Sequence, residues 1–303
     1  MQLSSRKVSK VLKTCFLAGC LNFLVAYGGV FDAGRHVLNE IIGQAPQAAP
    51  SLSQEEALKL FDNFRSQKIY GDYSFVFELQ HMPRQSKGSL FFGMIWGSWN
   101  EEGPIMRMEL WPVTQPQNRT ILIGQSGQHP KVWIVDTNAA NGYRQLTPEE
   151  IFKPLDKNLV YSPFELFFNY FYWDNPQYLR PVVVKGRPAQ AYRLQAPKWV
   201  KGIEKEYTHV DLFLDGEYGA LIEAYILGEN QKLEKSVKVL NFKKVQDQWI
   251  VKTIDLVDNV SKDKTRFDIR RAALNLQFDH SYFKPEKLLE PFPRIRENAY
   301  TVL

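Results

Sequence analysis

Between residues 72 and 272 the chain alternates apolar and polar side chains with the period of two that is typical of β-strands. Tyr73, Phe75, Phe77 and Leu79 share one face of the first such stretch. Turn-forming residues such as Asp215-Gly216 separate one stretch from the next. We count about eleven strands in this pattern. The expected strands are 73–79, 90–96, 105–111, 119–123, 131–136, 190–194, 209–214, 221–227, 235–244, 249–258 and 264–272.

Helical spacing precedes this pattern at one place and interrupts it at two. Ser53 precedes 54–65 as an N-cap, with acidic residues in the first turn, and two further helical segments are expected near 148–155 and 163–173. A chain of successive antiparallel strands with few helices is not the alternating order of a parallel α/β fold. The sequence therefore predicts a mainly β (α+β) protein built on one curved sheet.

The N-terminus has the organisation of an export signal. Four basic residues up to Lys13 precede an apolar run from Thr14 to Phe31. We assign 1–44 to a signal peptide and leader, 45–52 to a linker and 53–303 to a single domain. Three forms of the signal stay open: cleavage between Ala26 and Ala49, lipidation of Cys20 in the lipobox 17–20, or an uncleaved anchor, since about 18 apolar residues are the lower limit for spanning a membrane.

Composition excludes several classes of function. Apolar residues make up 44% of the chain and aromatic residues 14%, which suffices for a large core. The four basic residues of the signal account for most of the net charge of +5, so we expect no nucleic-acid partner. Both cysteines, Cys15 and Cys20, lie in the signal segment. The domain that follows therefore has no thiol for a disulfide, a metal site or nucleophilic attack.

No catalytic or cofactor motif stands out. The five histidines show no metal-ligand spacing, and the chain has neither a nucleophile elbow nor a phosphate-binding glycine loop. Ser261 and Lys264 match a Ser-x-x-Lys pattern, but they fall in a polar turn. We expect no metal, no cofactor and no enzymatic activity.

The most distinctive chemistry is apolar. A stripe of four phenylalanines runs along the segment after Ser162, and three of the five methionines fall on two adjacent strands. Thioethers and aromatic rings accommodate flexible apolar ligands without demanding one shape. We expect a cavity for acyl chains, although an ordinary core explains each residue equally well. Its candidate lining residues are Phe75, Phe77, Phe92, Met94, Trp96, Met106, Met108, Leu110, Phe164, Phe167, Phe168 and Phe171.

Over roughly residues 52–290 the order of these elements resembles the outer membrane lipoprotein-sorting family, the LolA/LolB-like periplasmic carriers. The resemblance rests on the signal peptide and first helix, on segments of several predicted strands and the stretches that follow them, and on Ser162-Pro-Phe164. The segments are 73–79, 88–96, 104–111, 127–136, 209–215, 248–252, 276–278 and 282–283.

This resemblance implies an open antiparallel half-barrel whose helices cover its concave face. It also implies a monomeric periplasmic carrier that receives lipoprotein acyl chains from an inner-membrane donor and releases them to an outer-membrane acceptor. Carriers of the family hold their lid with an arginine near the start of the third strand, where this chain has 99–104 without one. Arg107 is the nearest candidate latch, although alternation puts it opposite the methionines. The alternative is a membrane-anchored envelope scaffold of the same fold that binds a protein partner.

Overall fold

A single antiparallel sheet dominates the computed structural model, which describes residues 48–200, 203 and 207–303. The first half contributes α2 (Gln54–Arg65), β1 (Asp72–Met82), β2 (Ser89–Asn100), β3 (Gly103–Pro112), β4 (Thr120–Gln125), β5 (Lys131–Val135), β6 (Tyr143–Gln145), α3 (Pro148–Ile151) and α4 (Pro163–Leu166). The second half contributes β7 (Gln177–Val184), β8 (Arg187–Gln195), β9 (His209–Asp215), β10 (Leu221–Leu227), β11 (Leu233–Val245), β12 (Gln248–Asp258), β13 (Lys264–Leu276) and β14 (Thr301–Val302).

The strand order is β6-β5-β4-β3-β2-β1-β13-β12-β11-β10-β9-β8-β7, and β14 pairs with β13. Consecutive strands are therefore neighbours in the sheet, except that β6 and β7 lie at its two opposite edges. The pairing of β1 with β13 joins the two halves. The mainly β prediction is confirmed, with 14 strands in the sheet instead of about eleven. Periodicity missed β6, β7 and β14. β7 contains Pro181, which an edge strand tolerates because one side of it needs no hydrogen-bond donor.

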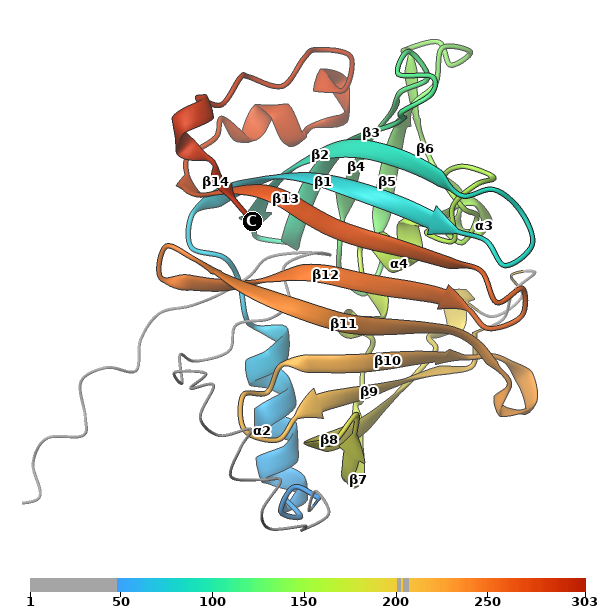
Figure 1. Ribbon diagram of the computed structural model, residues 1–303, viewed down its shortest axis with the longest axis vertical. Coiled ribbons are helices and arrows are strands. Elements are labelled where there is room, and N and C mark those ends of the chain that lie inside the picture. Colours follow the sequence, from blue (N-terminus) through green and yellow to red (C-terminus); the bar gives the residue numbers. More distant parts are fainter. Residues whose placement is uncertain (1–47, 201–202, 204–206) are drawn as a thin grey trace, which may run out of the picture.

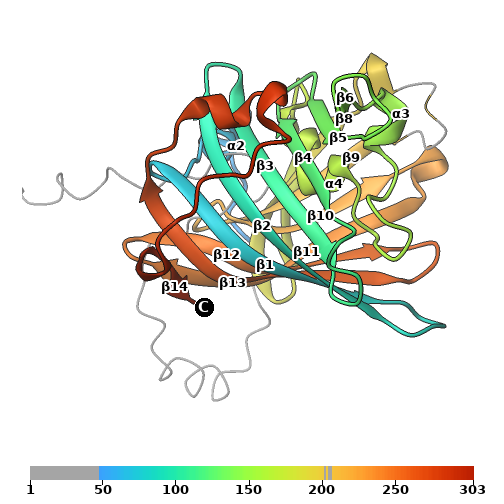
Figure 2. The same cartoon turned by 90° about the horizontal axis from the view of Figure 1, so that it is seen from above.

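The sheet is curved, and its concave side holds the main core (Figures 1 and 2). Helix α2 lies there and begins with a reciprocal capping box, in which Ser53 accepts from the Glu56 amide and Glu56 accepts from the Ser53 amide. Phe61 and Phe64 on α2 are fully buried. The Tyr192 hydroxyl on β8 donates to the Ala57 carbonyl at 2.9 Å. These contacts fix the helix within the curve of the open half-barrel.

The convex side differs between the two halves. Residues 277–300, here called the C-terminal segment, cross the outer face of β2 and β3 (Figure 2, red). Phe283, Leu288 and Phe292 of this segment form a second buried cluster with Trp96 and Ile123. On β8 to β13 the convex face instead carries cross-strand ion pairs, such as Arg193–Asp211 at 2.7 Å. Strands β2 and β3 are consequently covered on both faces.

The predicted signal peptide and the first three residues of the linker, 45–47, fall outside the described residues, so their assignment stays a prediction. Within the described ranges no helix is long and apolar enough to cross a membrane.

Candidate functional site

The concave core brings together most of the predicted cavity residues. One buried cluster contains the β1 and β3 candidates and all four phenylalanines of the later segment. These residues are Phe75, Phe77, Met106, Met108, Leu110, Phe164, Phe167, Phe168 and Phe171. Each is at most 4% exposed, so the side chains of the protein itself fill this part of the half-barrel. Whether any of them binds lipid stays a prediction.

The β2 candidates lie on the other face. Strand pairing sets Phe77 opposite Gly93 and Tyr73 opposite Gly97, so these two glycines face the concave core. Phe92, Met94 and Trp96 alternate with them and point to the convex side, where Trp96 stacks on Phe292. The prediction that these three line the cavity is wrong. Periodicity identified the residues that share a face of β2, but both faces of this strand are covered.

The glycines on β2 and β4 are the sequence feature that could have shown which face of each strand packs toward the concave core. A Cβ at Gly93 would overlap the Phe77 ring, and a Cβ at Gly97 would overlap the Tyr73 ring. On β4, Gly124 makes the same room for Phe167. Large rings on one element therefore fit over glycines on the next, which marks the glycine-bearing face as the one toward the core.

The aromatic segment, residues 159–173, covers the concave face but is not one continuous helix. Helix α4 ends at Leu166, Phe168 has a left-handed backbone (φ 42°), and a separate 3-10 turn spans Asn169–Tyr172. The predicted helix over 163–173 is therefore interrupted, because the segment bends to bury rings on several sides. Phe168 stacks on Phe171, which in turn packs edge-on against Phe64 of α2.

A buried ion pair fixes this segment to β11. Glu165 is fully buried and its Oε1 lies 2.7 Å from Lys235 Nζ. The other carboxylate oxygen accepts from the Ser162 amide at 2.8 Å and from the Ser162 hydroxyl. Burial, together with nearby carboxylates that include Glu165, raises the pKa of Tyr161 and Tyr207 well above its usual value, so both phenols stay protonated. The pair is thus part of a closed polar cluster within an apolar interior.

Arg107 holds the C-terminal segment. Its guanidinium is fully buried on the convex side and donates to the carbonyls of Lys287 (2.9 Å), Leu288 (3.2 Å) and Glu290 (2.5 Å). Burial lowers the pKa of Arg107, and nearby acidic groups, first Glu109, offset part of that effect. The prediction that Arg107 latches a lid over the concave face is therefore wrong. Arg107 instead binds the C-terminal segment on the convex face.

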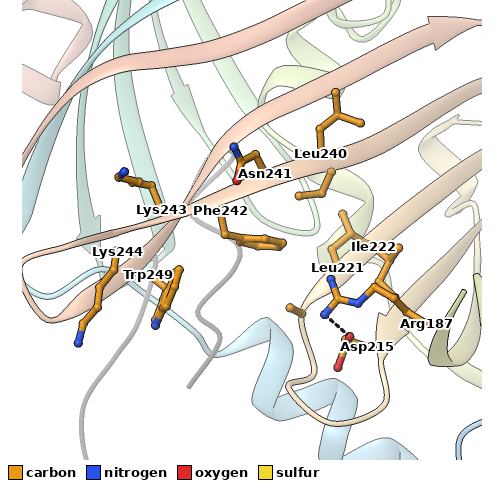
Figure 3. Close-up of a pocket in the computed structure, with 12 residues that line it drawn as sticks. Arg187, Asp215, Leu221, Ile222, Leu240, Asn241, Phe242, Lys243, Lys244 and Trp249 are labelled. Atoms are coloured by element: carbon orange, nitrogen blue, oxygen red, sulfur yellow. Dashed lines mark ion pairs between the residues drawn. The ribbon is translucent and has the colours of Figure 1, made fainter. Parts of the chain in front are cut away.

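A cleft opens where β10 and β11 separate (Figure 3). Their pairing ends at Glu223 and Lys238, and bulges on either side of Asn241 turn β11 away from β10. The cleft has a volume of about 570 Å³. Its walls are mainly apolar, and the Phe242 ring points toward Leu221 and Ile222.

This cleft borders the main core of the protein. Leu221 and Val239 line it and also belong to the main core cluster, against which Phe242 and Trp249 pack. At one end Arg187 pairs with Asp215 at 2.6 Å, and at the other lie Lys243 and Lys244. Sequence reasoning missed this site, because alternation along each strand does not show where two strands part.

A smaller pocket of about 420 Å³ brings together Asp72, Ser98 and His280. Ser98 Oγ donates to Asp72 at 2.6 Å and lies 3.2 Å from His280 Nε2. A hydrolytic triad needs the carboxylate on the far nitrogen of the imidazole, with the serine proton directed to the ring. Here the serine hydroxyl donates its hydrogen bond to the carboxylate and not to the ring, so the trio does not form an activated nucleophile. The described part of the chain also has no cluster of three or more residues suited to a metal ion.

Comparison with solved structures identifies the class of fold. An outer membrane lipoprotein-sorting protein domain from Vibrio parahaemolyticus is similar with a TM-score of 0.65 and 14% identity, covering 78% of this chain and 99% of that one. A LolA superfamily protein from Nitrosomonas europaea has a TM-score of 0.58 and 13% identity, covering 77% and 98%. The half-barrel is therefore the LolA-like fold, as the sequence resemblance predicted.

A DUF1329 family protein from Desulfovibrio piger shares the fold as well, with a TM-score of 0.61 and 12% identity over 78% of this chain and 98% of that one. A family model described as an uncharacterized protein matches residues 173–290. No curated protein matches the sequence.

Proposed function

We propose that this protein is a non-enzymatic, monomeric periplasmic carrier that binds lipoprotein acyl chains and takes part in sorting lipoproteins to the outer membrane. The observation that carries the proposal is the apolar cleft between β10 and β11, which borders the main core of a LolA-like half-barrel. Its volume of about 570 Å³ lies within the range typical of small-molecule sites, roughly 300–1,000 Å³.

Acyl chains gain free energy from burial in such a cleft. Each methylene removed from water contributes about 0.8 kcal/mol. Because the concave core is already filled, a second or longer chain needs the aromatic segment to move. The left-handed Phe168 and the break between α4 and the 3-10 turn mark where that segment bends. A donor and an acceptor protein at the two membranes complete the proposed cycle.

One observation favours a second candidate function. The concave face is packed with the protein's own rings, among them the fully buried Phe164 and Phe171. A scaffold that binds a protein partner needs no empty interior. In that case the protein stays attached to the envelope, through Cys20 or an uncleaved signal, and carries no lipid.

Native mass spectrometry of the protein purified from the envelope fraction tests the proposal. We expect a co-purifying acylated lipoprotein or lipid, and we expect Phe242→Glu to lose it because the new carboxylate would enter the apolar cleft. Phe213→Glu is the matched control, since Phe213 is also a half-buried strand phenylalanine but lies outside the cleft. A membrane-anchored protein without bound lipid would instead favour the scaffold. Equal loss of the co-purifying lipid in both variants would show that the cleft is not the binding site.

A further inference from the structure

The basic residues at one end of the cleft differ from most others on the sheet in their ion pairing. Elsewhere basic side chains lie against carboxylates, as in Lys252–Asp268 at 3.1 Å and Lys185–Glu223 at 2.7 Å. Lys243 has no ion pair within 4 Å among the described residues. Within the described part of the chain, the ion pair of Lys244 is with Asp247 at 3.8 Å, and the Asp247 side chain is fully exposed. Two positive charges at the β11 end of the cleft are therefore weakly compensated.

At the opposite end of the cleft, the positive charge is neutralised by an ion pair. Arg187 lies there with its guanidinium 2.6 Å from Asp215, whose side chain is only 5% exposed. Between the two ends the cleft is lined by Leu221, Ile222 and Phe242. The site is thus an apolar cleft with weakly compensated positive charge at one end only.

From this polarity we propose that the cleft binds one long-chain fatty acid, with its carboxylate at Lys244, which shares a face of β11 with Phe242, and its hydrocarbon chain along Phe242 toward Leu221 and Ile222. The inference rests on the proposed lipid-binding function and names the chemical class of its ligand. The positive charge at one end of the cleft favours a ligand with an anionic head group. The single apolar cleft favours a ligand with one hydrocarbon chain. Trp249, on the strand paired with Lys244, lies within contact of the bound chain.

Bromine quenching of tryptophan emission tests this placement. The probe is a dibrominated long-chain fatty acid in monomeric form, and its methyl ester is the neutral counterpart. We expect the acid to quench the intact protein and to bind about tenfold more tightly than the ester, because the positive charge at this end of the cleft attracts the carboxylate. In Trp249→Phe most of the quenching should disappear while the acid still binds.

Charge-reversal variants locate the head group. Lys243→Glu/Lys244→Glu should abolish the preference for the acid over the ester. Lys157→Glu/Lys262→Glu is the control, because it makes the same change of charge at two exposed loop lysines that do not line the cleft. It should keep the affinity for the acid within about twofold, because exposed charges distant from a site contribute little to binding there.

Other outcomes would overturn the inference. The proposed binding site is wrong if the acid and the ester bind equally well. It is also wrong if reversing the charges of Lys243 and Lys244 leaves the preference for the acid unchanged, or if Trp249→Phe is still fully quenched. Quenching only by brominated phosphatidylglycerol vesicles would assign the surface to a membrane. If a diacylated lipopeptide binds while the fatty acid does not, the inference fails and the carrier function stands. If neither binds, the carrier function fails as well.

Discussion

At the scale of single residues, Arg107 shows how one side chain can organise a distant part of the chain. It is fully buried and donates to three carbonyls of residues 287–290, which lie about 180 positions later in the sequence. An arginine suits this role because its planar group carries five donors. Its place on β3 was predictable, whereas its partners were not, since nothing local connects β3 with the C-terminal segment.

Replacing Arg107 with Met should loosen the C-terminal segment. Four carbonyls between residues 282 and 290 lose a charged donor, so we expect the free energy of unfolding to fall by about 2 kcal/mol. Amide hydrogen exchange in 280–292 should accelerate. Arg119→Met is the control, because Arg119 is half exposed and pairs with Glu109 at 3.3 Å, so its loss should cost less than about 1 kcal/mol. Unchanged exchange in 280–292 would show that the apolar contacts alone hold the segment.

At the scale of elements, the aromatic segment combines a correct prediction with a wrong one. Its four phenylalanines are buried together, as the spacing predicted, but they belong to a short helix and a 3-10 turn. Helical periodicity indicates which residues face a core. It does not indicate where the chain must bend to fit rings such as Phe167 over Gly124.

Removing one partner of the Glu165–Lys235 pair should destabilise the whole segment. Lys235→Met leaves a carboxylate in an apolar interior, and we expect a loss of about 3–5 kcal/mol in guanidinium unfolding. The double variant Glu165→Gln/Lys235→Met should recover much of that loss, because no unpaired charge remains. Lys131→Met breaks an exposed pair with Glu102 and should cost under about 1 kcal/mol. Additive losses in the double variant would show that the pair is not coupled.

At the scale of the whole molecule, the sheet is stabilised on both sides by different means. The main core and α2 cover the concave face, the C-terminal segment covers β2 and β3, and ion pairs cover much of the convex face of β8 to β13. Two buried histidines lie on strands of this sheet, His81 on β1 and His209 on β9. Burial is the main cause that lowers the pKa of each.

These histidines predict how stability depends on pH. The unfolded chain takes up their protons below about pH 6.5, while the folded protein keeps them neutral to lower pH. Stability should therefore fall as the pH drops from 7.5 through 6.5, until the folded pKa values are reached. In His81→Gln/His209→Gln the melting temperature, measured by thermal unfolding, should depend less on pH between pH 7.5 and pH 5.5. The exposed His129→Gln is the control, and an equal slope in both variants would contradict the assignment.

The sequence by itself determined the class of fold and the main apolar face. Alternation on β1 and β3 identified Phe75, Phe77, Met106 and Met108 as residues that share the concave side, because a side-chain period of two is a local property of a strand. The order of strands and helices was enough to predict the LolA-like half-barrel.

Only the tertiary structure decided which face of β2 meets the core, what Arg107 holds and where the sheet opens. Each of these depends on partners far away in sequence: the β1 rings over Gly93 and Gly97, the carbonyls of 287–290, and the divergence of β11 from β10. A strand covered on both faces reads as apolar throughout, so its pattern cannot assign either face. The cleft arises from the path of two backbones, which bulges and twist set and side-chain periodicity does not record.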